Sequence, residues 1–502
     1  MTDLNELIIL EDQAGESRWD LFKQKCPTLS DWGLTTLHSG LDAYAKSIVI
    51  EPNYVCKDHR NLHSYFYSKK FKERSSVCVR AHFFDRTGIK RPDLMENPER
   101  LNDNYIGYSV IRPVSERCLG RTVIDPYKVG RKVKDGFYML RTQFKSHLNG
   151  PTLNVCGYPY MSQDTEATVC AHTALWSMCR YLSERYTVYP ETYPYDFITG
   201  TTDTDGRTAP YRGMTYTDYS RLLTQFGCHP EILFMREETT NWWGKKSSTL
   251  SAEKFMRLCT YVESGFPVLA SYRGHVVSVV GHTIDHTRKP KPNKHGWIDS
   301  SGYLKQFVVV DDNFFPYRLL GYQGDPGNYG GVYPAGGYAM ESLYTAVCPL
   351  PEKVYLPSEQ AREQCEALLK TLIATHPAEV TAGKTNPLVT RLFVTTASAF
   401  KRRKLEKSLA GGKVTDPFAV KIADMHLPHF LWVMEVSPLE LYRQGTCTTE
   451  IVLDTTANGL EECLLYARAG AKLILNNKVI ELKNPGLNLS MFAQYTHNLG
   501  EL

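Results

Sequence analysis

Four polar residues in the middle of the chain have the types and the order that acyl chemistry at a thiol requires. They are Gln163, Cys170, His275 and Asp311. A thiol attacks an acyl carbon as the thiolate, so it needs a neighbouring base that takes its proton and stays charged. An imidazole is such a base, and a carboxylate on its second nitrogen fixes its orientation. A side-chain amide and a backbone N–H group together can stabilise an oxyanion.

The segment that begins at Cys170 is predicted to be a helix with one buried face. Apolar side chains recur with i, i+3, i+4, i+7 spacing at Ala171, Ala174, Leu175, Met178, Cys179 and Leu182. Cys170 then lies in the first turn, where free N–H groups and the helix dipole favour a thiolate. A cysteine at a helix start is also often a small buried hydrophobe, so this helix alone does not decide its role.

Apolar runs that predict strands position the other two groups. VLASY at 268–272 is a predicted strand, and His275 lies in the short link to a second one, VVSVV. FVVV at 307–310 predicts the next strand, and Asp311 and Asp312 follow it directly. Because side chains alternate along a strand, the two aspartates are expected to point to opposite faces, and only one of them to meet His275.

This order of segments resembles the papain-like cysteine peptidases, and among them the bacterial branch that includes the peptidases that process bacteriocin leaders. The resemblance lies in SQDTEATVCAHTALW, SGFPVLASYRGHVVSVVGH and FVVVDDN. It implies a helix that bears the cysteine and packs on an antiparallel sheet. It also implies Cys170 as the nucleophile, His275 as general base and acid, and Asp311 as the orienting acceptor, since the family's acceptor follows the strand directly.

The resemblance further implies Gln163 as the oxyanion donor. Gln163 lies seven residues before Cys170, one more than the family's usual spacing. Two other histidines are weaker candidates for the base. His172 points elsewhere on the predicted helix, and His282 lies at the far end of the second strand.

The whole chain of 502 residues is predicted to be α+β with three domains. Glycines and prolines near residue 150 and a change of character after residue 350 mark the boundaries. Residues 1–145 and 351–502 are predicted as flanking α+β domains of unknown role around a papain-like domain at 146–350. The last domain is expected to contain helices at 360–375 and 460–468.

The composition indicates a globular protein of the cytoplasm. Hydrophobic residues make up 42% of the chain and charged residues 22%, and the net charge of +4 gives no case for binding nucleic acid or an acidic membrane. The thirteen cysteines are odd in number and lack a repeating spacing, which favours reduced thiols over a secreted disulfide scaffold. The N-terminal residues do not form a signal peptide, and no run is apolar enough to span a membrane.

No metal or organic cofactor is predicted. Cys56, His59 and His63 have the residue types of a metal cluster, as do Cys78 and His82, but neither group has the second pair of ligands that such sites usually show.

The predicted function is hydrolysis of a peptide or amide bond in a protein or peptide substrate, through a thioester on Cys170. Two alternatives stay open. The same site would transfer the acyl group to an amine in a reaction of the transglutaminase type, or the fold would be an inactive papain-like binding or scaffold module. Loops at 186–212, 285–301 and 321–338 are expected to border the cleft and set specificity. The sequence leaves the substrate and the oligomeric state open.

Overall fold

The computed structural model describes most of the chain. The described residues are 6–96, 98–132, 136–148, 150, 152–200, 213–240, 246–322, 338–410, 413–414, 416–458, 462–475, 478–482 and 489–491. The chain is 33% helix and 33% strand, with several antiparallel sheets, which confirms the predicted α+β class.

The chain divides into two compact units, each built from separate stretches. The first contains Met1–Gly227, Pro267–Val280 and Phe307–Val347, and the second contains Cys228–Phe266, Gly281–Gln306 and Cys348–Leu502. The chain therefore passes between the units several times, and three of these passages fall inside strands. The division into domains at residues 145 and 350 stays a prediction.

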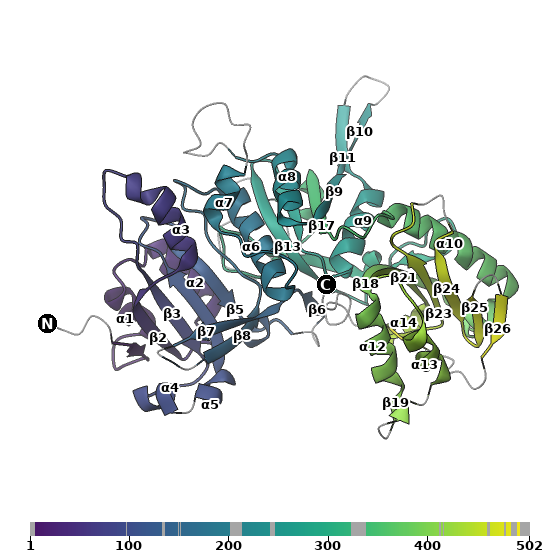
Figure 1. Cartoon of the computed structure of the whole chain (residues 1–502), viewed down its shortest axis with the longest axis horizontal. Coiled ribbons are helices and arrows are strands. Elements are labelled where there is room, and N and C mark those ends of the chain that lie inside the picture. Colours follow the sequence, from purple (N-terminus) through teal and green to yellow (C-terminus); the bar gives the residue numbers. More distant parts are fainter. Residues whose placement is uncertain are drawn as a thin grey trace. The chain divides into compact units, whose positions relative to one another are not determined.

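The N-terminal part of the first unit is a five-stranded antiparallel sheet (Figure 1). Its order is β1 (Ile8–Leu10), β2 (Ser47–Tyr54), β3 (Cys78–Phe84), β4 (Tyr105–Ile111) and β5 (Leu119–Ile124). Neighbouring residues of β3 serve opposite faces, as strand alternation requires. The ring of Phe83 lies 6.4 Å from that of Trp19, whereas Phe84 belongs to an apolar cluster with Phe144 and Val155.

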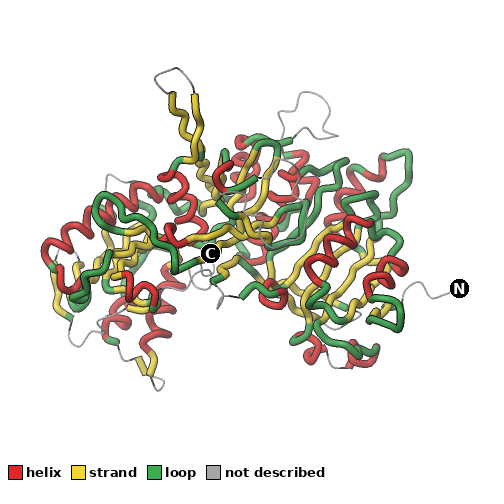
Figure 2. Tube along the Cα trace, turned by 180° about the vertical axis from the view of Figure 1, so that it is seen from behind, coloured by secondary structure: helices red, strands yellow, loops and turns green. Residues whose placement is uncertain are grey.

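Helices and a hairpin cover this sheet on its two faces. Trp19 belongs to α1 (Arg18–Lys25), which is capped by Ser17 and followed by α2 (Asp31–Leu41). The hairpin of β7 (Thr142–His147) and β8 (Thr152–Gly157) supplies the apolar side chains of the other face. Figure 2 shows the same sheet from behind, with helices lying over it. The remaining helices of this unit are α3 (Lys57–Tyr65), α4 (Arg91–Glu96), α5 (Pro98–Asn102), α7 (Pro194–Thr199) and α8 (Tyr216–Phe226).

A second sheet runs through the middle of the chain. Its order is β16 (Arg318–Leu320), β15 (Leu304–Val310), β13 (His275–Ile284), β12 (Val268–Tyr272), β17 (Thr345–Leu350) and β9 (His229–Phe234), with β6 (Phe137–Met139) paired to β13. The three strands predicted from VLASY, VVSVV and FVVV are thus confirmed as β12, β13 and β15. The pairings of β13 with β12 and of β15 with β16 are antiparallel.

The helix that starts at Cys170 is α6 (Cys170–Arg185), and it is buried on all sides. Every residue from Ala171 to Leu182 is buried, so the predicted single buried face is wrong. The reason is that partners lie on opposite sides of the helix. The Ser278 hydroxyl of β13 donates to the Ala174 carbonyl at 3.1 Å, and the indole N–H of Trp176 donates to Asp58 of α3 at 3.1 Å. Burial on both sides holds the first turn of α6 in place.

The second unit is built on another large sheet. Its order is β14 (Ile298–Asp299), β18 (Leu388–Thr396), β21 (Phe430–Pro438), β23 (Thr449–Asp454), β24 (Leu464–Ala469), β25 (Lys472–Leu475) and β26 (Lys478–Glu481). The helices of this unit are α9 (Ala252–Glu263), α10 (Ser358–Thr375), α11 (Pro377–Thr381), α12 (Ala397–Ser408), α13 (Pro417–Asp424) and α14 (Leu439–Arg443). The helix predicted at 360–375 is confirmed as α10, whereas residues 464–468 of the second predicted helix belong to strand β24.

Helices pack on both faces of this sheet. Leu431 of β21 joins an apolar cluster with Phe400 of α12 and Phe418 of α13. Its neighbour Trp432 points to the opposite face, where its ring lies 6.1 Å from Tyr261 of α9. Separate two-stranded sheets are formed by β10 (Arg236–Thr240) with β11 (Lys246–Leu250), by β19 (Leu409–Ala410) with β20 (Lys413–Val414), and by β22 (Thr446–Cys447) with β27 (Leu489–Ser490).

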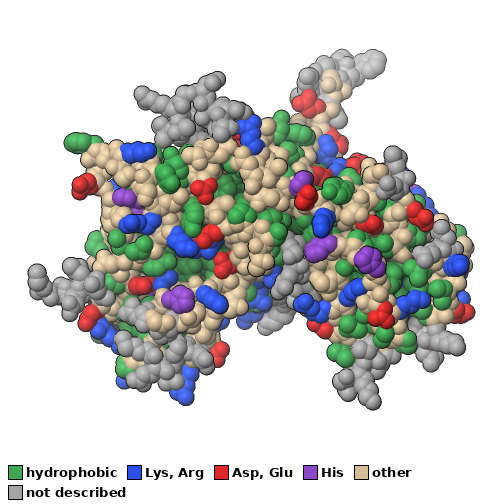
Figure 3. All heavy atoms as spheres, in the orientation of Figure 1, with side chains coloured by type: hydrophobic (Ala, Val, Ile, Leu, Met, Phe, Trp, Pro, Cys, Tyr) green, Lys and Arg blue, Asp and Glu red, His purple; other side chains and the backbone are tan. Residues whose placement is uncertain are grey.

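The surface carries charges of both signs. On the face shown in Figure 3, lysine and arginine side chains alternate with aspartate and glutamate, as the small net charge suggests. Among the residues described, no helix is both long and apolar enough to cross a bilayer.

Candidate active site

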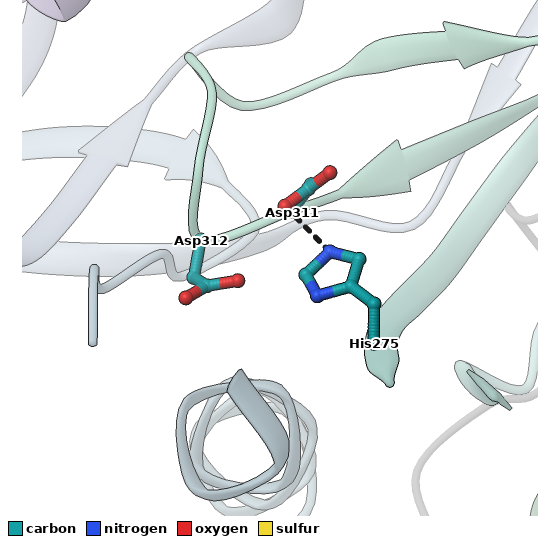
Figure 4. Close-up of side chains that lie close together, drawn as sticks. All are labelled: His275, Asp311 and Asp312. Carbon is teal, nitrogen blue, oxygen red and sulfur yellow. Dashed lines mark hydrogen bonds and ion pairs between the residues drawn. The ribbon is translucent and has the colours of Figure 1, made fainter. Parts of the chain in front are cut away.

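His275 and Asp311 form a hydrogen-bonded pair in the first unit (Figure 4). His275 is the first residue of β13 and lies opposite Tyr272, the last residue of β12. The turn between the strands is tight, and Gly274 adopts a φ of +76°, which favours glycine. The His275 Nε2 atom lies 3.0 Å from Asp311 Oδ1. The hairpin thus fixes the imidazole against the carboxylate, as the sequence predicts.

Asp311 is held by several donors at once. Its side chain is fully buried, and Oδ1 also accepts from the backbone N–H of Asn313 at 3.0 Å. The other oxygen, Oδ2, accepts from the Tyr338 hydroxyl and lies 3.5 Å from Arg318 Nη1. These donors leave the carboxylate little freedom to turn.

The surroundings of His275 favour its protonated form. Burial lowers the pKa of the ring, but hydrogen bonds to Asp311 and to the Cys170 thiol, together with the charges of Asp311 and Asp312, raise it to about 10. Since Nε2 is bound to Asp311, Nδ1 is the nitrogen left for the thiol. An imidazolium between a thiol and a carboxylate is the arrangement that stabilises a thiolate.

Cys170 differs from the other cysteines in its setting. None of the thirteen cysteines forms a disulfide, and Cys170 and Cys156 are half-exposed, whereas the other eleven are buried. Burial raises the pKa of the Cys56 thiol to about 11. Cys170 begins α6 after Val169, which offers no side-chain cap. The His172 N–H donates to the Val169 carbonyl at 3.0 Å, so the N–H groups of Cys170 and Ala171 are the ones that can face an anion.

The other histidines lie in different settings. The His172 ring is fully buried, its Nδ1 accepts from the Val169 N–H at 3.2 Å, and burial lowers its pKa to about 4. It is therefore neutral and serves the helix start. His282 belongs to the second unit, where its Nε2 lies 2.7 Å from Glu263.

The segment before Cys170 is ordered by Asp164. Its Oδ1 accepts from the backbone N–H groups of Glu166, Ala167 and Thr168 at 3.0, 2.8 and 2.8 Å. Gln163, the residue before it, is half-buried, and its backbone N–H faces the Asp312 carboxylate, whose pKa it lowers. The structure therefore places Gln163 beside the site through its backbone, and the role of its side-chain amide stays a prediction.

Asp312 lies in the site as well, so the expectation that the two aspartates point apart is wrong. Nitrogen and oxygen atoms of His275, Asp311 and Asp312 lie within 4.8 Å of one another. Strand β15 ends at Val310, and the two aspartates belong to the turn after it, where strand alternation no longer applies. Asp311 is nevertheless the one that hydrogen-bonds to His275, as predicted.

The same three residues form the one group, within the described ranges, whose ligand types and spacing suit a metal ion. The oxygens of Asp311 are already bound by Asn313, Tyr338 and His275, which favours a site for proton transfer. The histidines of the N-terminal region have other partners. His59 and His63 bind the carbonyls of Ser75 and Arg74, and His82 binds the Tyr105 hydroxyl.

An open groove lies in the first unit, with a volume of about 830 Å³. Trp32, Arg74 and residues 113–117 are among those that line it. The guanidinium of Arg117 lies 4.4 Å from the Trp32 ring centroid. The backbone carbonyl of Arg117 accepts a hydrogen bond from the Ser162 hydroxyl at 2.9 Å. Because Ser162 precedes Gln163, this bond ties the groove to the segment that leads into Cys170.

Some groups of the site carry no sequence pattern that identifies them. Tyr338 reaches Asp311 from 27 positions further along the chain, and Arg318 from seven, and no sequence pattern marks either residue. Asp164 is different, because an aspartate in a polar loop that binds the following N–H groups is a common turn pattern. Two of the loops predicted to border the cleft lie partly outside the described residues, at 201–212 and 323–337.

Comparison with known proteins adds no relative. No protein-family model matches the chain, and no curated protein and no solved structure matches it either. The functional argument therefore rests on the residues and on the geometry of the site.

Proposed function

We propose that this protein is a cysteine peptidase with a papain-like catalytic part, in which Cys170, His275 and Asp311 hydrolyse a peptide or amide bond. One observation carries the proposal. A half-exposed thiol at a helix N-terminus lies near enough to an imidazole to raise its pKa, and the Nε2 atom of that imidazole is bound to a buried carboxylate.

The reaction follows from these positions. The Cys170 thiol gives its proton to His275, and the thiolate attacks the carbonyl carbon of the scissile bond. The oxyanion that forms is stabilised by N–H groups at the start of α6, with the Gln163 amide as a second donor. His275 then protonates the leaving amine, and the acyl group stays on sulfur as a thioester. Water activated by His275 releases the acid and restores the thiol.

A polypeptide substrate in the cytoplasm fits the remaining observations. The groove of about 830 Å³ is within the size range of ligand sites, and it adjoins the segment that carries Gln163. Thirteen cysteines without a disulfide favour a reducing compartment. No metal or organic cofactor enters the proposed steps.

The proposal is tested first by the reactivity of the thiols. A limiting dose of iodoacetamide at neutral pH, followed by peptide mapping, should label Cys170 before any other cysteine. Cys156 is the internal control, because it is equally half-exposed but its pKa is raised by burial. Equal labelling of both residues would favour an inactive binding module.

The second test identifies the reaction. A peptide library incubated with the protein should gain new termini, and C170A should produce none. Added amine distinguishes the two reactions, since hydrolysis yields free acids and acyl transfer yields amine-linked products.

A further inference from the structure

Two adjacent carboxylates of the site differ sharply in how they are bound. Asp311 receives hydrogen bonds from His275, Asn313 and Tyr338. Asp312 is only 5% exposed, and its Oδ1 accepts a single side-chain bond, from Asn313 Nδ2 at 3.3 Å. Its Oδ2 is buried without a hydrogen-bond partner among the described residues. A carboxylate left in this state is costly, and an uncharged side chain of the same size would avoid the cost.

The groups around Asp312 come from four parts of the first unit. His275 and Asp311 lie within 4.8 Å, the Gln163 backbone N–H faces the carboxylate, and Arg117 adds a positive charge. The Tyr160 hydroxyl donates to the Asp312 carbonyl at 3.2 Å. Burial and the neighbouring Asp311 raise the pKa of Asp312, while His275, Arg117 and the Gln163 N–H lower it, with a result of about 7.

We propose that Asp312 is a second carboxylate of the site and acts as a positioning residue, setting by its charge how firmly His275 holds its proton. This inference rests on the proposed function. The proton moves from the Cys170 thiol to His275 Nδ1 and later from Nδ1 to the leaving amine. Ionised Asp312 stabilises the charged imidazolium. It therefore favours proton transfer from the thiol to His275 and opposes proton transfer from His275 to the leaving amine. Protonated Asp312 removes one negative charge and eases the second transfer.

The test uses D312N, which keeps the shape of the side chain and removes its charge. The rate of Cys170 alkylation by iodoacetamide is measured as a function of pH, with peptide mapping as the readout. An upper inflection is expected where His275 loses its proton. A charge within 4.8 Å of the imidazolium is worth at least one pKa unit at an effective dielectric of about 20. In D312N this inflection should therefore move down by about one pH unit or more.

The matched control is D125N. Burial also raises the pKa of Asp125, which caps a turn through the Tyr127 N–H, and an asparagine preserves that bond. D125N should leave the alkylation profile unchanged. D312S gives a second uncharged replacement, and it should shift the inflection in the same direction as D312N.

The outcomes separate this inference from the proposed function. If wild-type Cys170 is not labelled preferentially, the proposed function fails. If it is labelled preferentially but D312N and D312S keep the wild-type inflection, only the role of Asp312 is overturned. If neither D312N nor D312S folds, as judged by thermal unfolding, Asp312 has a structural role, and its proposed effect on the His275 proton is overturned too.

Discussion

The hydroxyl of Tyr338 donates a hydrogen bond to Asp311 Oδ2, the carboxylate oxygen that is not bound to His275. The ring of Tyr338 also lies 5.2 Å from that of His275 and 4.7 Å from that of Tyr272. One side chain therefore holds the carboxylate by a hydrogen bond and the imidazole by packing. Arg318 joins them, since its Nη1 donates to the Tyr338 hydroxyl at 3.2 Å.

We expect Y338F to lower kcat for peptide hydrolysis by about tenfold, with little change in KM. The variant keeps the ring but removes a bond to a charged acceptor, worth about 1.5–3 kcal/mol before neighbouring donors compensate. Steady-state kinetics on a peptide substrate measures the effect. Y355F is the control, because Tyr355 is exposed and belongs to the second unit, and a wild-type kcat for Y338F would contradict the role of Tyr338.

We expect D164A to destabilise the protein by about 2–4 kcal/mol, since three backbone N–H groups lose their acceptor. The same change should slow Cys170 alkylation, because Asp164 orders the segment that leads into α6. Denaturant unfolding and alkylation kinetics measure the two effects. D164N retains an acceptor oxygen and should lose markedly less stability. If D164A and D164N lose the same stability, the hydrogen bonds that the Asp164 side-chain oxygen accepts do not stabilise the protein.

The pH dependence of stability should report His275. Its pKa is raised from 6.5 to about 10 in the folded protein, so the folded state holds the proton more tightly than the unfolded chain. This contribution to stability is fully present below pH 6.5 and is lost as the pH rises through about 10. Thermal unfolding of the wild type and H275Q across this range tests it. The difference between their midpoints should shrink with rising pH, and a constant difference would argue against an imidazolium.

A buried ion cluster in the second unit makes a separate prediction. Arg391 is 1% exposed, lies 2.8 Å from Glu435 and also binds Glu263. R391M leaves both carboxylates without this cation and should destabilise the protein by about 3–5 kcal/mol. R391K keeps the charge and should destabilise it less. Denaturant unfolding measures the stability of both variants. An unchanged free energy of unfolding in R391M would mean that the cluster contributes nothing to stability.

The sequence predicts the local parts of the site better than the contacts between distant parts. Apolar β-branched runs predict strand β13, which begins at His275, and strand β15, which ends just before Asp311, because such runs favour buried strands. The pairing of these two residues followed from their order and from the resemblance to a known family. Strand alternation predicts that Asp312 points away from His275. Asp312 lies near His275 instead, because it belongs to the turn after β15, where alternation no longer holds.

Contacts between distant parts of the chain also explain where the structure differs from the predicted secondary structure and burial. Residues 464–468 contain the helix formers leucine, alanine and arginine, yet pairing with β23 and β25 makes them a strand. Tertiary contacts thus override a weak local preference. Burial of α6 on every side also depends on partners far away in the chain. Tyr338, which binds Asp311 across 27 positions, shows the same limit.

The interleaving of the two units has a consequence for synthesis on the ribosome. The first unit needs the stretch Phe307–Val347, so Asp311 reaches His275 only after most of the chain has been translated. Translation at roughly 5–20 residues per second separates the arrival of Cys170 from that of Asp311 by several seconds or more. If the proposed function holds, a nascent chain carries the thiol several seconds before its proton acceptor is oriented, and the emerging polypeptide and its neighbours would be protected from cleavage during that time. Ribosome-stalled chains that end before Asp311 should show no preferential labelling of Cys170, whereas chains extended well beyond Val347 should show it.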